Sequence, residues 1–283
     1  MKPQGAIRLA GETWYIPGLT NSGYTDGLVI DTGAECEPYR EATLDTLVVT
    51  HGHADHFSTG AVVRGLGARV IAARDDARLV ENPEVNIRGM FSWARPGDQL
   101  ISKLFMGTPC PVDGLAEEWA DDRARVVPLA GHTLGHIGVL TADGVLFSGD
   151  ALYQRALWER HPLPYAIDPH MVAESVRRID ALDFEILVPG HGVPCSKQEA
   201  SEHIAHHIER ITEIEHFLLA KLAQERTTEE AIALVSAKCG LSDNPAQYWL
   251  AVTTVKGFLG EMLGRGAIEF YVRDNVGWWR AKA

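Results

Sequence analysis

The sequence lacks any apolar run long enough to cross a bilayer, and its first ten residues hold no continuous apolar stretch of signal-peptide length. We therefore expect a cytoplasmic protein with no membrane partner. Cysteine is also scarce, and its four positions are widely scattered: Cys36, Cys110, Cys195 and Cys239. Such spacing is typical neither of a thiolate zinc site nor of a small disulfide scaffold.

Basic residues are outnumbered, since 26 lysines and arginines face 38 aspartates and glutamates and leave a net charge of -12. A negative chain repels polyanions, which argues against tight binding of nucleic acid. Hydrophobic residues make up 46% and charged residues 23%, as in ordinary globular proteins. With 283 residues the chain is long enough for one large domain and a small second one.

Short apolar or β-branched runs recur through the first two thirds of the chain and predict buried strands. They cover residues 13–16, 27–30, 46–49, 69–72, 125–127, 145–147 and 186–188. Helical patterns separate several of these runs, for example over residues 172–182. The first two thirds therefore predict a mixed α/β domain whose sheets are covered by helices.

Three of these runs end in a residue that can ligate a metal. LVVT is followed by His51, VLFSG by Asp150, and ILVPG by His191. A rigid sheet that delivers side chains at its strand ends holds a site in fixed geometry. We therefore expect these three residues to share one site.

The segment His51-Gly-His53-Ala-Asp55-His56 places four candidate ligands, His51 among them, in one loop. Imidazoles and carboxylates are the nitrogen and oxygen ligands of zinc, and a catalytic site leaves a position for water or substrate. A loop histidine is usually a solvated side chain, but four such groups in six residues favour a metal site.

Together with this loop, three later motifs resemble, in order, those of the metallo-β-lactamase superfamily. The four motifs are Thr50-His-Gly-His-Ala-Asp-His56, Gly131-His-Thr-Leu-Gly-His136, Ser148-Gly-Asp150 and Pro189-Gly-His-Gly192. The stretch Val29-Ile-Asp-Thr-Gly33 fits as well, so the resemblance covers about residues 10 to 195. It implies an αββα sandwich with two metals at one edge of two facing sheets.

The resemblance also implies a division of the ligands between two divalent metals. The first metal would take His51, His53 and His132, the second would take Asp55, His56 and His191, and Asp150 would bridge them. Zinc is the default expectation, with iron and manganese as alternatives, because these ligands accept all three. Two such cations, about 3.5–4 Å apart, would acidify a shared water and so produce the nucleophile.

Two aspartates are expected to assist the metals. Asp55 is the predicted catalytic residue, which accepts a hydrogen bond from the attacking hydroxide. Asp31 is expected to orient the loop from His51 to His56 through hydrogen bonds. His136 is expected to be a structural neighbour of the His132 turn, and His203, His206, His207 and His216 to lie on a long helix.

Two segments are candidates for the substrate pocket. A turn-rich insertion over residues 91–119 contains Phe105 and predicts a lid or wall for an apolar acyl group; alternatively it packs on the scaffold or on a second subunit. Tyr153 and Arg155, just after Asp150, are candidates for the other wall. The arginine would suit a substrate carboxylate or phosphate.

The pattern changes near residue 196, so we predict a catalytic domain over 1–196 and a small C-terminal domain over 197–283. A long amphipathic stretch is followed by the capping box Thr227-x-x-Glu230, a helix ending near Gly240, a helix over 245–263 and a hairpin over 267–279. This outline is that of a helical, winged-helix-like module.

This C-terminal arrangement resembles a lactamase-like subgroup that includes a mitochondrial endoribonuclease and acyl-carrier thioesterases. The expected function is metal-dependent hydrolysis of a small-molecule thioester, ester or lactone. One alternative is a metal-dependent endoribonuclease acting on single-stranded RNA. The other is a non-enzymatic, metal-bearing regulatory module. The expected partner is a small acyl substrate, and a homodimer is the expected assembly if the insertion packs on a second copy.

Overall fold

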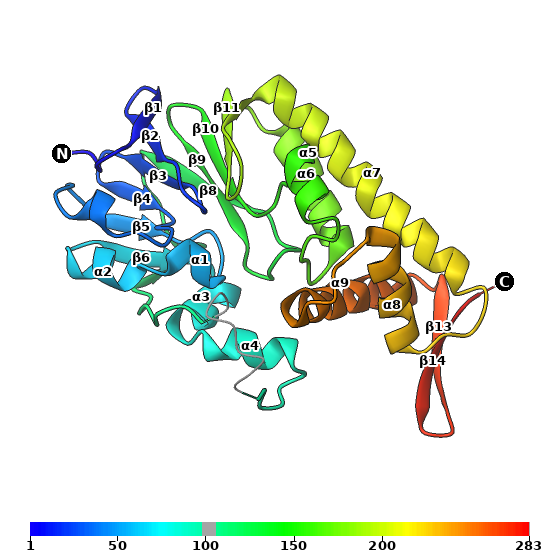
Figure 1. Ribbon diagram of the computed structural model, residues 1–283. Coiled ribbons are helices and arrows are strands. Elements are labelled where there is room, and N and C mark those ends of the chain that lie inside the picture. The colour runs from blue at the N-terminus through cyan, green and yellow to red at the C-terminus, as the bar shows by residue number, and fades with distance from the viewer. Residues whose placement is uncertain (98–105, 283) are drawn as a thin grey trace.

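Two facing β-sheets form the centre of the computed structural model, which describes residues 1–97 and 106–282. Helices cover the outer sides of both sheets (Figure 1). The first sheet has seven strands in chain order: β1 (Ile7–Ala10), β2 (Thr13–Ile16), β3 (Ser22–Thr25), β4 (Leu28–Ile30), β5 (Thr46–Val48), β6 (Arg69–Ala72) and β7 (Gly114–Leu115). Its first four strands pair antiparallel and its last four pair parallel.

The second sheet has five strands in the order β12-β11-β10-β9-β8. These strands are β8 (Ala124–Pro128), β9 (Ile137–Thr141), β10 (Val145–Gly149), β11 (Ile186–Pro189) and β12 (Cys195–Ser196). Only β10 and β11 pair parallel, and the segment between them, which contains two helices, makes the crossover. The ends of β5, β10 and β11 therefore carry His51, Asp150 and His191 to one edge of the sandwich.

Alternating side chains explain why two sheets stack here. Leu28 and Ile30 of β4 point into the layer between the sheets, where they meet Val139 and Phe147 of the second sheet. Val29, between them, points the other way into a core shared with helices. Each sheet thus buries both faces, which accounts for the nearly continuous apolar runs of the sequence.

The helices form the two outer layers. Those nearest the first sheet are α1 (Ala54–Phe57), α2 (Gly60–Gly65), α3 (Arg74–Glu81) and α4 (Glu84–Met90). Those nearest the second sheet are α5 (Arg155–Arg160), α6 (Pro169–Ala181) and α7 (Lys197–Lys221). The predicted αββα architecture is confirmed. None of the helices in the described ranges combines the length and hydropathy needed to span a bilayer.

The C-terminal region contains α8 (Thr228–Cys239), α9 (Pro245–Gly264) and the hairpin β13 (Ile268–Arg273) and β14 (Val276–Ala281), which projects from the molecule (Figure 1). Both bonds of the predicted capping box at Thr227 are present, and Gly240 ends α8 in the left-handed conformation. The helices and hairpin are confirmed. That they form a winged helix stays a prediction.

The C-terminal region shares its core with the rest of the chain. Ala200 and Ile204 of α7 pack in the cluster that covers the second sheet. Further along α7, Ile214 packs with Phe258 of α9 and with Trp158 of α5. Because α7 belongs to both cores, the boundary at residue 196 stays a prediction.

Candidate metal centre

The loop after β5 presents its side chains in a fixed order. His51 follows the end of the strand, His53 caps α1 in an extended conformation, and Asp55 lies in the first turn of α1. His56, one residue on, is fully buried. Four candidate ligands from six residues thus face one space because a strand end and a helix start are joined by a tight loop.

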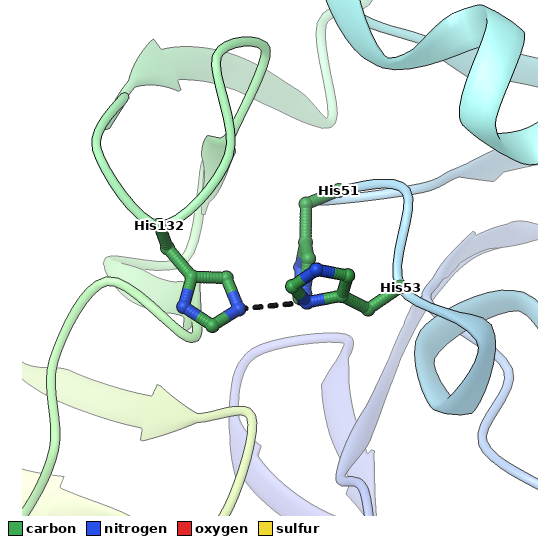
Figure 2. Close-up of side chains that lie close together, drawn as sticks. All are labelled: His51, His53 and His132. Carbon is green, nitrogen blue, oxygen red and sulfur yellow. Dashed lines mark hydrogen bonds between the residues drawn. The ribbon is translucent and has the colours of Figure 1, made fainter. Parts of the chain in front are cut away.

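His132 joins His51 and His53 from a separate loop. His51 Nε2 lies 3.1 Å from His53 Nδ1, and His53 Nδ1 lies 2.8 Å from His132 Nε2. Figure 2 shows the three rings pointing toward one another from the two loops. These three residues, which we call the first group, are a cluster that suits a metal ion.

Asp55, His56 and His191 form the second group. His191 Nε2 lies 3.2 Å from Asp55 Oδ2, and His56 Nε2 lies 3.8 Å from the same oxygen. The side chains of His191 and Asp55 are 22% and 25% exposed, whereas that of His132 is 3% exposed. His53 of the first group is also partly exposed, so solvent reaches the centre beside both groups.

Asp150 lies between the two groups. Its Oδ2 is 3.6 Å from His132 Nε2 of the first group and 3.4 Å from His191 Nε2 of the second. Its Oδ1 is 3.3 Å from His56 Nε2. One carboxylate oxygen of Asp150 thus lies near both groups and the other near His56; that Asp150 bridges two metals stays a prediction.

The donor atoms of this centre fit divalent cations. His56 Nε2 and Asp150 Oδ1 are buried, and neither has a hydrogen-bond partner among the described residues. A buried polar atom left unpaired is costly, so a missing partner is expected at such a place. Ligands about 2.0–2.1 Å from a tetrahedral zinc ion lie roughly 3.4 Å apart, close to the separations found here. The cluster suits a dinuclear metal site.

Asp31 orients this centre from behind. Its Oδ1 accepts a hydrogen bond from the Thr50 amide over 2.7 Å, and its Oδ2 accepts one from the Thr50 hydroxyl over 2.7 Å. Its Oδ2 also lies 2.8 Å from His56 Nδ1. With Nδ1 facing Asp31, the ring of His56 presents its Nε2 toward Asp150.

Backbone carbonyls orient two other imidazoles in the same way. His132 Nδ1 lies 2.9 Å from the carbonyl oxygen of Tyr165, and His191 Nδ1 lies 2.7 Å from that of Leu19. A carbonyl oxygen only accepts, so each ring donates from Nδ1 and presents its Nε2 to the centre. Both rings are therefore oriented as a metal ligand must be, with Nε2 toward the centre.

Asp76 is a support that the sequence did not reveal. Its Oδ2 accepts hydrogen bonds from the Gly52 amide over 2.8 Å and from the Thr133 hydroxyl over 2.6 Å. Its Oδ1 accepts from the Gly135 amide over 2.7 Å. One buried carboxylate thus ties the loop of His51 and His53 to the loop of His132.

Tyr153 and His136 hold Asp150 in place. The Tyr153 hydroxyl donates to Asp150 Oδ2 over 3.3 Å, and the Asp150 amide donates to His136 Nε2 over 3.0 Å. The Tyr153 amide in turn donates to Nδ1 of His207 on α7 over 3.2 Å. His136 is thus a buried neighbour of the centre, whereas the contribution of His207 was not anticipated.

Charge is balanced differently in the two groups. Burial, reinforced by the neighbouring His53, lowers the pKa of His132 to about 3. At His191 the charge of Asp150 comes first and raises the pKa to about 11. Burial would lower the pKa of His56, but the surrounding carboxylates, Asp150 foremost, outweigh it and raise the pKa to about 10. The first group thus offers neutral imidazoles, and a cation in the second group displaces protons.

Two glycines let the loops approach closely. A Cβ atom at Gly190 would lie 2.2 Å from Asp150 Oδ1, and one at Gly149 would lie 2.7 Å from His136 Nε2. Gly149 also has a φ of 50°, which favours glycine. The residues just before Asp150 and His191 are therefore small because the centre leaves no room for a side chain.

The three predicted pocket residues differ in their placement. Tyr153 is buried with its hydroxyl turned toward Asp150. Arg155 is exposed at the start of α5, where its amide donates to His203 Nδ1 on α7 over 3.5 Å. Phe105 lies outside the described residues. Of the surrounding insertion, Phe91 packs against Trp249 of α9 with ring centroids 4.1 Å apart and ring planes tilted by 39°.

The ligand loops lie within the part of the chain that matches a known sequence family. Residues 19–191 match the model of the Metallo-beta-lactamase superfamily. This match includes all seven clustered side chains, namely His51, His53, Asp55, His56, His132, Asp150 and His191.

Among curated proteins, a beta-lactamase-like protein 2 homolog of Drosophila melanogaster is 26% identical, with 94% of this chain and 90% of that protein covered. A hydroxyacylglutathione hydrolase of Vibrio cholerae is 34% identical over 45% of this chain and 43% of its own length. A probable metallo-hydrolase of Bacillus subtilis, YflN, is 29% identical over 53% of this chain. The chain spans 65% of YflN and less than half of the Vibrio enzyme.

Solved structures share the fold over nearly the whole chain. A metallo-beta-lactamase family protein of Thermus thermophilus has a TM-score of 0.66 and 21% identity, with 95% of this chain and 98% of that chain covered. At this identity the likeness concerns the fold alone. The family match, the sandwich and the ligand cluster together show that the chain belongs to the metallo-beta-lactamase superfamily and is a metal-dependent hydrolase.

Proposed function

We propose that this hydrolase cleaves a small-molecule thioester, with esters and lactones as chemically related substrates. The observation that carries the proposal is the position of Asp150 between two groups of ligand atoms, which suits a pair of divalent cations. The hydroxyacylglutathione hydrolase relative supports the substrate class, because hydroxyacylglutathione is a thioester. Zinc is the proposed metal.

The proposed ligands follow the two groups. His51, His53 and His132 would hold one ion and Asp55, His56 and His191 the other, with Asp150 shared. When bound, two such ions lower the pKa of water toward neutrality and stabilise the charge that develops on the substrate.

Asp55 is the proposed catalytic residue. Its Oδ2 accepts a hydrogen bond from the Thr20 hydroxyl over 3.0 Å and faces His191. That arrangement leaves Oδ1 to accept a proton or hydrogen bond from the attacking water. Neighbouring His56 keeps the pKa of Asp55 low despite burial, so the carboxylate is ionised at neutral pH and ready to accept. Asp31 would act through His56, not on the substrate.

The surface argues for a small substrate over RNA. The net charge is -12, and two arginines of the C-terminal hairpin are already paired. Arg273 lies 2.9 Å from Glu225, and Arg280 pairs with Glu225 and Glu269. A nucleic-acid surface needs cations that are available to phosphates. The C-terminal region is therefore proposed to serve the catalytic site and not to bind RNA.

A substrate panel tests this proposal. Acyl-thioesters, a lactone, a β-lactam and single-stranded RNA are offered to wild type and to Asp55→Ala, with zinc or manganese added. We expect metal-dependent release of thiol by wild type and a large loss in the variant. Cleavage of RNA alone would make the chain an endoribonuclease, and two bound metals without turnover of any substrate would favour a regulatory module.

A further inference from the structure

A groove of about 420 Å³ lies between the C-terminal end of α4, the segment before α6, and α9. We call it the α4–α9 groove. Its walls are mixed: Met90, Ile167 and Val252 are apolar, whereas Ser92 and Thr253 carry hydroxyls and Lys256 carries a positive charge. A volume of this size falls within the roughly 300–1,000 Å³ typical of small-molecule sites.

The walls of this groove are fastened to the ligand loops. Asn86 of α4 donates to the carbonyl of Gly52, between His51 and His53, over 3.1 Å. Ile167 donates to the carbonyl of Gly131, next to His132, over 2.9 Å. Gly89, the first residue of α4 that lines the groove, follows Asn86 by three residues. The groove therefore begins about one helical turn, or about 5.4 Å, beyond Asn86.

Tyr165 lies beside the first group, two residues before a wall of the groove. Its ring centroid lies 5.1 Å from that of His53 and 5.4 Å from that of His132. Ile167, two residues further on, is already a wall of the groove. Two extended residues span at most about 7 Å, so this wall of the groove and the first group lie close together in space.

Lys256 is the available charge of the groove. Two carboxylates also line it, but Asp168 accepts from the Met171 amide over 3.0 Å and Glu261 lies 3.4 Å from Arg265. Within residues 1–97 and 106–282, no carboxylate lies within 4.0 Å of the Lys256 ammonium. The groove therefore offers an unpaired cation to a ligand.

Two helical glycines keep the groove open. A Cβ atom built at Gly89 of α4 or at Gly260 of α9 would meet nothing within 4 Å. Glycine inside a helix costs about 0.5–1 kcal/mol relative to alanine, and no packing contact requires it at either position. These positions therefore leave space in the groove that a side chain would otherwise occupy.

We propose that the α4–α9 groove binds the thiol half of the thioester and that Lys256 binds an anion at the end of that half. This inference rests on the proposed thioester hydrolysis. The mixed walls suit an extended, amide-bearing thiol that alternates apolar and hydrogen-bonding segments. The anion is a carboxylate, as in glutathione, or a phosphate, as in coenzyme A.

The test compares one acyl group on three thiols: glutathione, coenzyme A, and the short neutral thiol N-acetylcysteamine. Lys256→Gln is expected to raise KM about tenfold for the anionic substrate that is used, which corresponds to about 1.4 kcal/mol, and to leave the neutral one unchanged. Gly260→Leu is expected to raise KM for the longer thiols at least as much. The preferred anionic substrate identifies the carboxylate or the phosphate as the bound group.

Matched controls are Lys221→Gln on α7 and Gly65→Leu on α2, where a Cβ atom also meets nothing within 4 Å. Equal changes in KM for anionic and neutral thioesters, or none, would overturn the assignment of the groove. If wild type cleaves no thioester, the proposed function fails. In that case, binding of free glutathione and of free coenzyme A, measured by calorimetry, tests the groove alone. Binding to wild type that is lost in Lys256→Gln supports the assignment of the groove. Absence of binding to wild type refutes that assignment.

Discussion

Tyr153 joins Asp150 to α7 through two hydrogen bonds. Its hydroxyl donates to Asp150 Oδ2 over 3.3 Å, and its amide donates to His207 Nδ1 over 3.2 Å. The rings of Tyr153 and His207 are stacked with centroids 5.8 Å apart. Residues beyond the matched family region thus help to position the carboxylate that lies between the two ligand groups.

Tyr153→Phe removes one hydrogen bond to Asp150 and leaves the ring in place. Partners of metal ligands typically contribute about 10–100-fold to metal affinity or activity, and we expect a loss near the lower end because one bond is removed. Metal affinity is measured by competition with a chelator. Tyr248→Phe, at an exposed position on α9, is the control. Equal affinities of Tyr153→Phe and wild type would show that the hydroxyl does not position Asp150.

His207 predicts a dependence of stability on pH. Burial lowers its folded-state pKa to about 3, below the unfolded value near 6.5. Between these values the unfolded chain binds more protons, so the free energy of unfolding decreases as the pH falls. This single histidine contributes a slope of up to about 1.4 kcal/mol per pH unit.

His207→Asn keeps an acceptor for the Tyr153 amide but does not titrate. Denaturant unfolding of the metal-free protein between pH 6.5 and 4.5 is expected to show a shallower decline in the variant than in wild type. His216→Asn on the same helix should retain the wild-type slope. Parallel declines in His207→Asn and wild type would mean that His207 is not held neutral in the folded state.

Asp31 and Asp150 are expected to differ in the severity of their loss. Asp31→Asn keeps the shape of the side chain but weakens its bonds to Thr50 and His56, so we expect metal affinity to fall about 10–100-fold. Asp150→Asn removes a proposed ligand of both ions and should abolish binding of at least one. Metal content after dialysis measures both effects. A greater loss in Asp31→Asn would reverse the proposed order.

Gly257 tests the contact of α9 with the catalytic region. A Cβ atom there would lie 2.6 Å from the carbonyl oxygen of Ile167 and 2.9 Å from Pro169 Cδ. Gly257→Ala should therefore destabilise the protein by about 1–3 kcal/mol. Gly260→Ala, one turn on and without contacts, should stabilise it by about 0.5–1 kcal/mol. Denaturant unfolding measures both, and equal effects would refute the close packing.

The ligand cluster could be predicted because its residues lie in short motifs that are visible in the sequence. Four of the residues lie in one loop, and His132, Asp150 and His191 each follow a strand or close a glycine turn. Strands with continuous apolar character were equally visible, and β2 and β6 have the predicted bounds. Because these strands are buried on both faces, their residues are nearly all apolar, and such runs can be recognised in the sequence.

Other features depend on contacts between distant segments. The strand β3, Ser-Gly-Tyr-Thr, has no apolar pattern and is ordered by pairing with β2 and β4. Asp76 resembles any acidic residue in the first turn of a helix, and only the fold brings the Thr133 hydroxyl to it. The α4–α9 groove likewise requires helices more than 150 positions apart in sequence to meet.

Hydrolysis followed during metal titration tests the central claim most directly. Metal-free protein is titrated with zinc while thiol release from an acyl-thioester and the amount of bound metal are recorded together. Activity should be absent without metal and reach its plateau at about two ions per chain, as expected for a two-metal site. Full thioester hydrolysis by the metal-free chain, or a plateau at one ion per chain, would contradict the account.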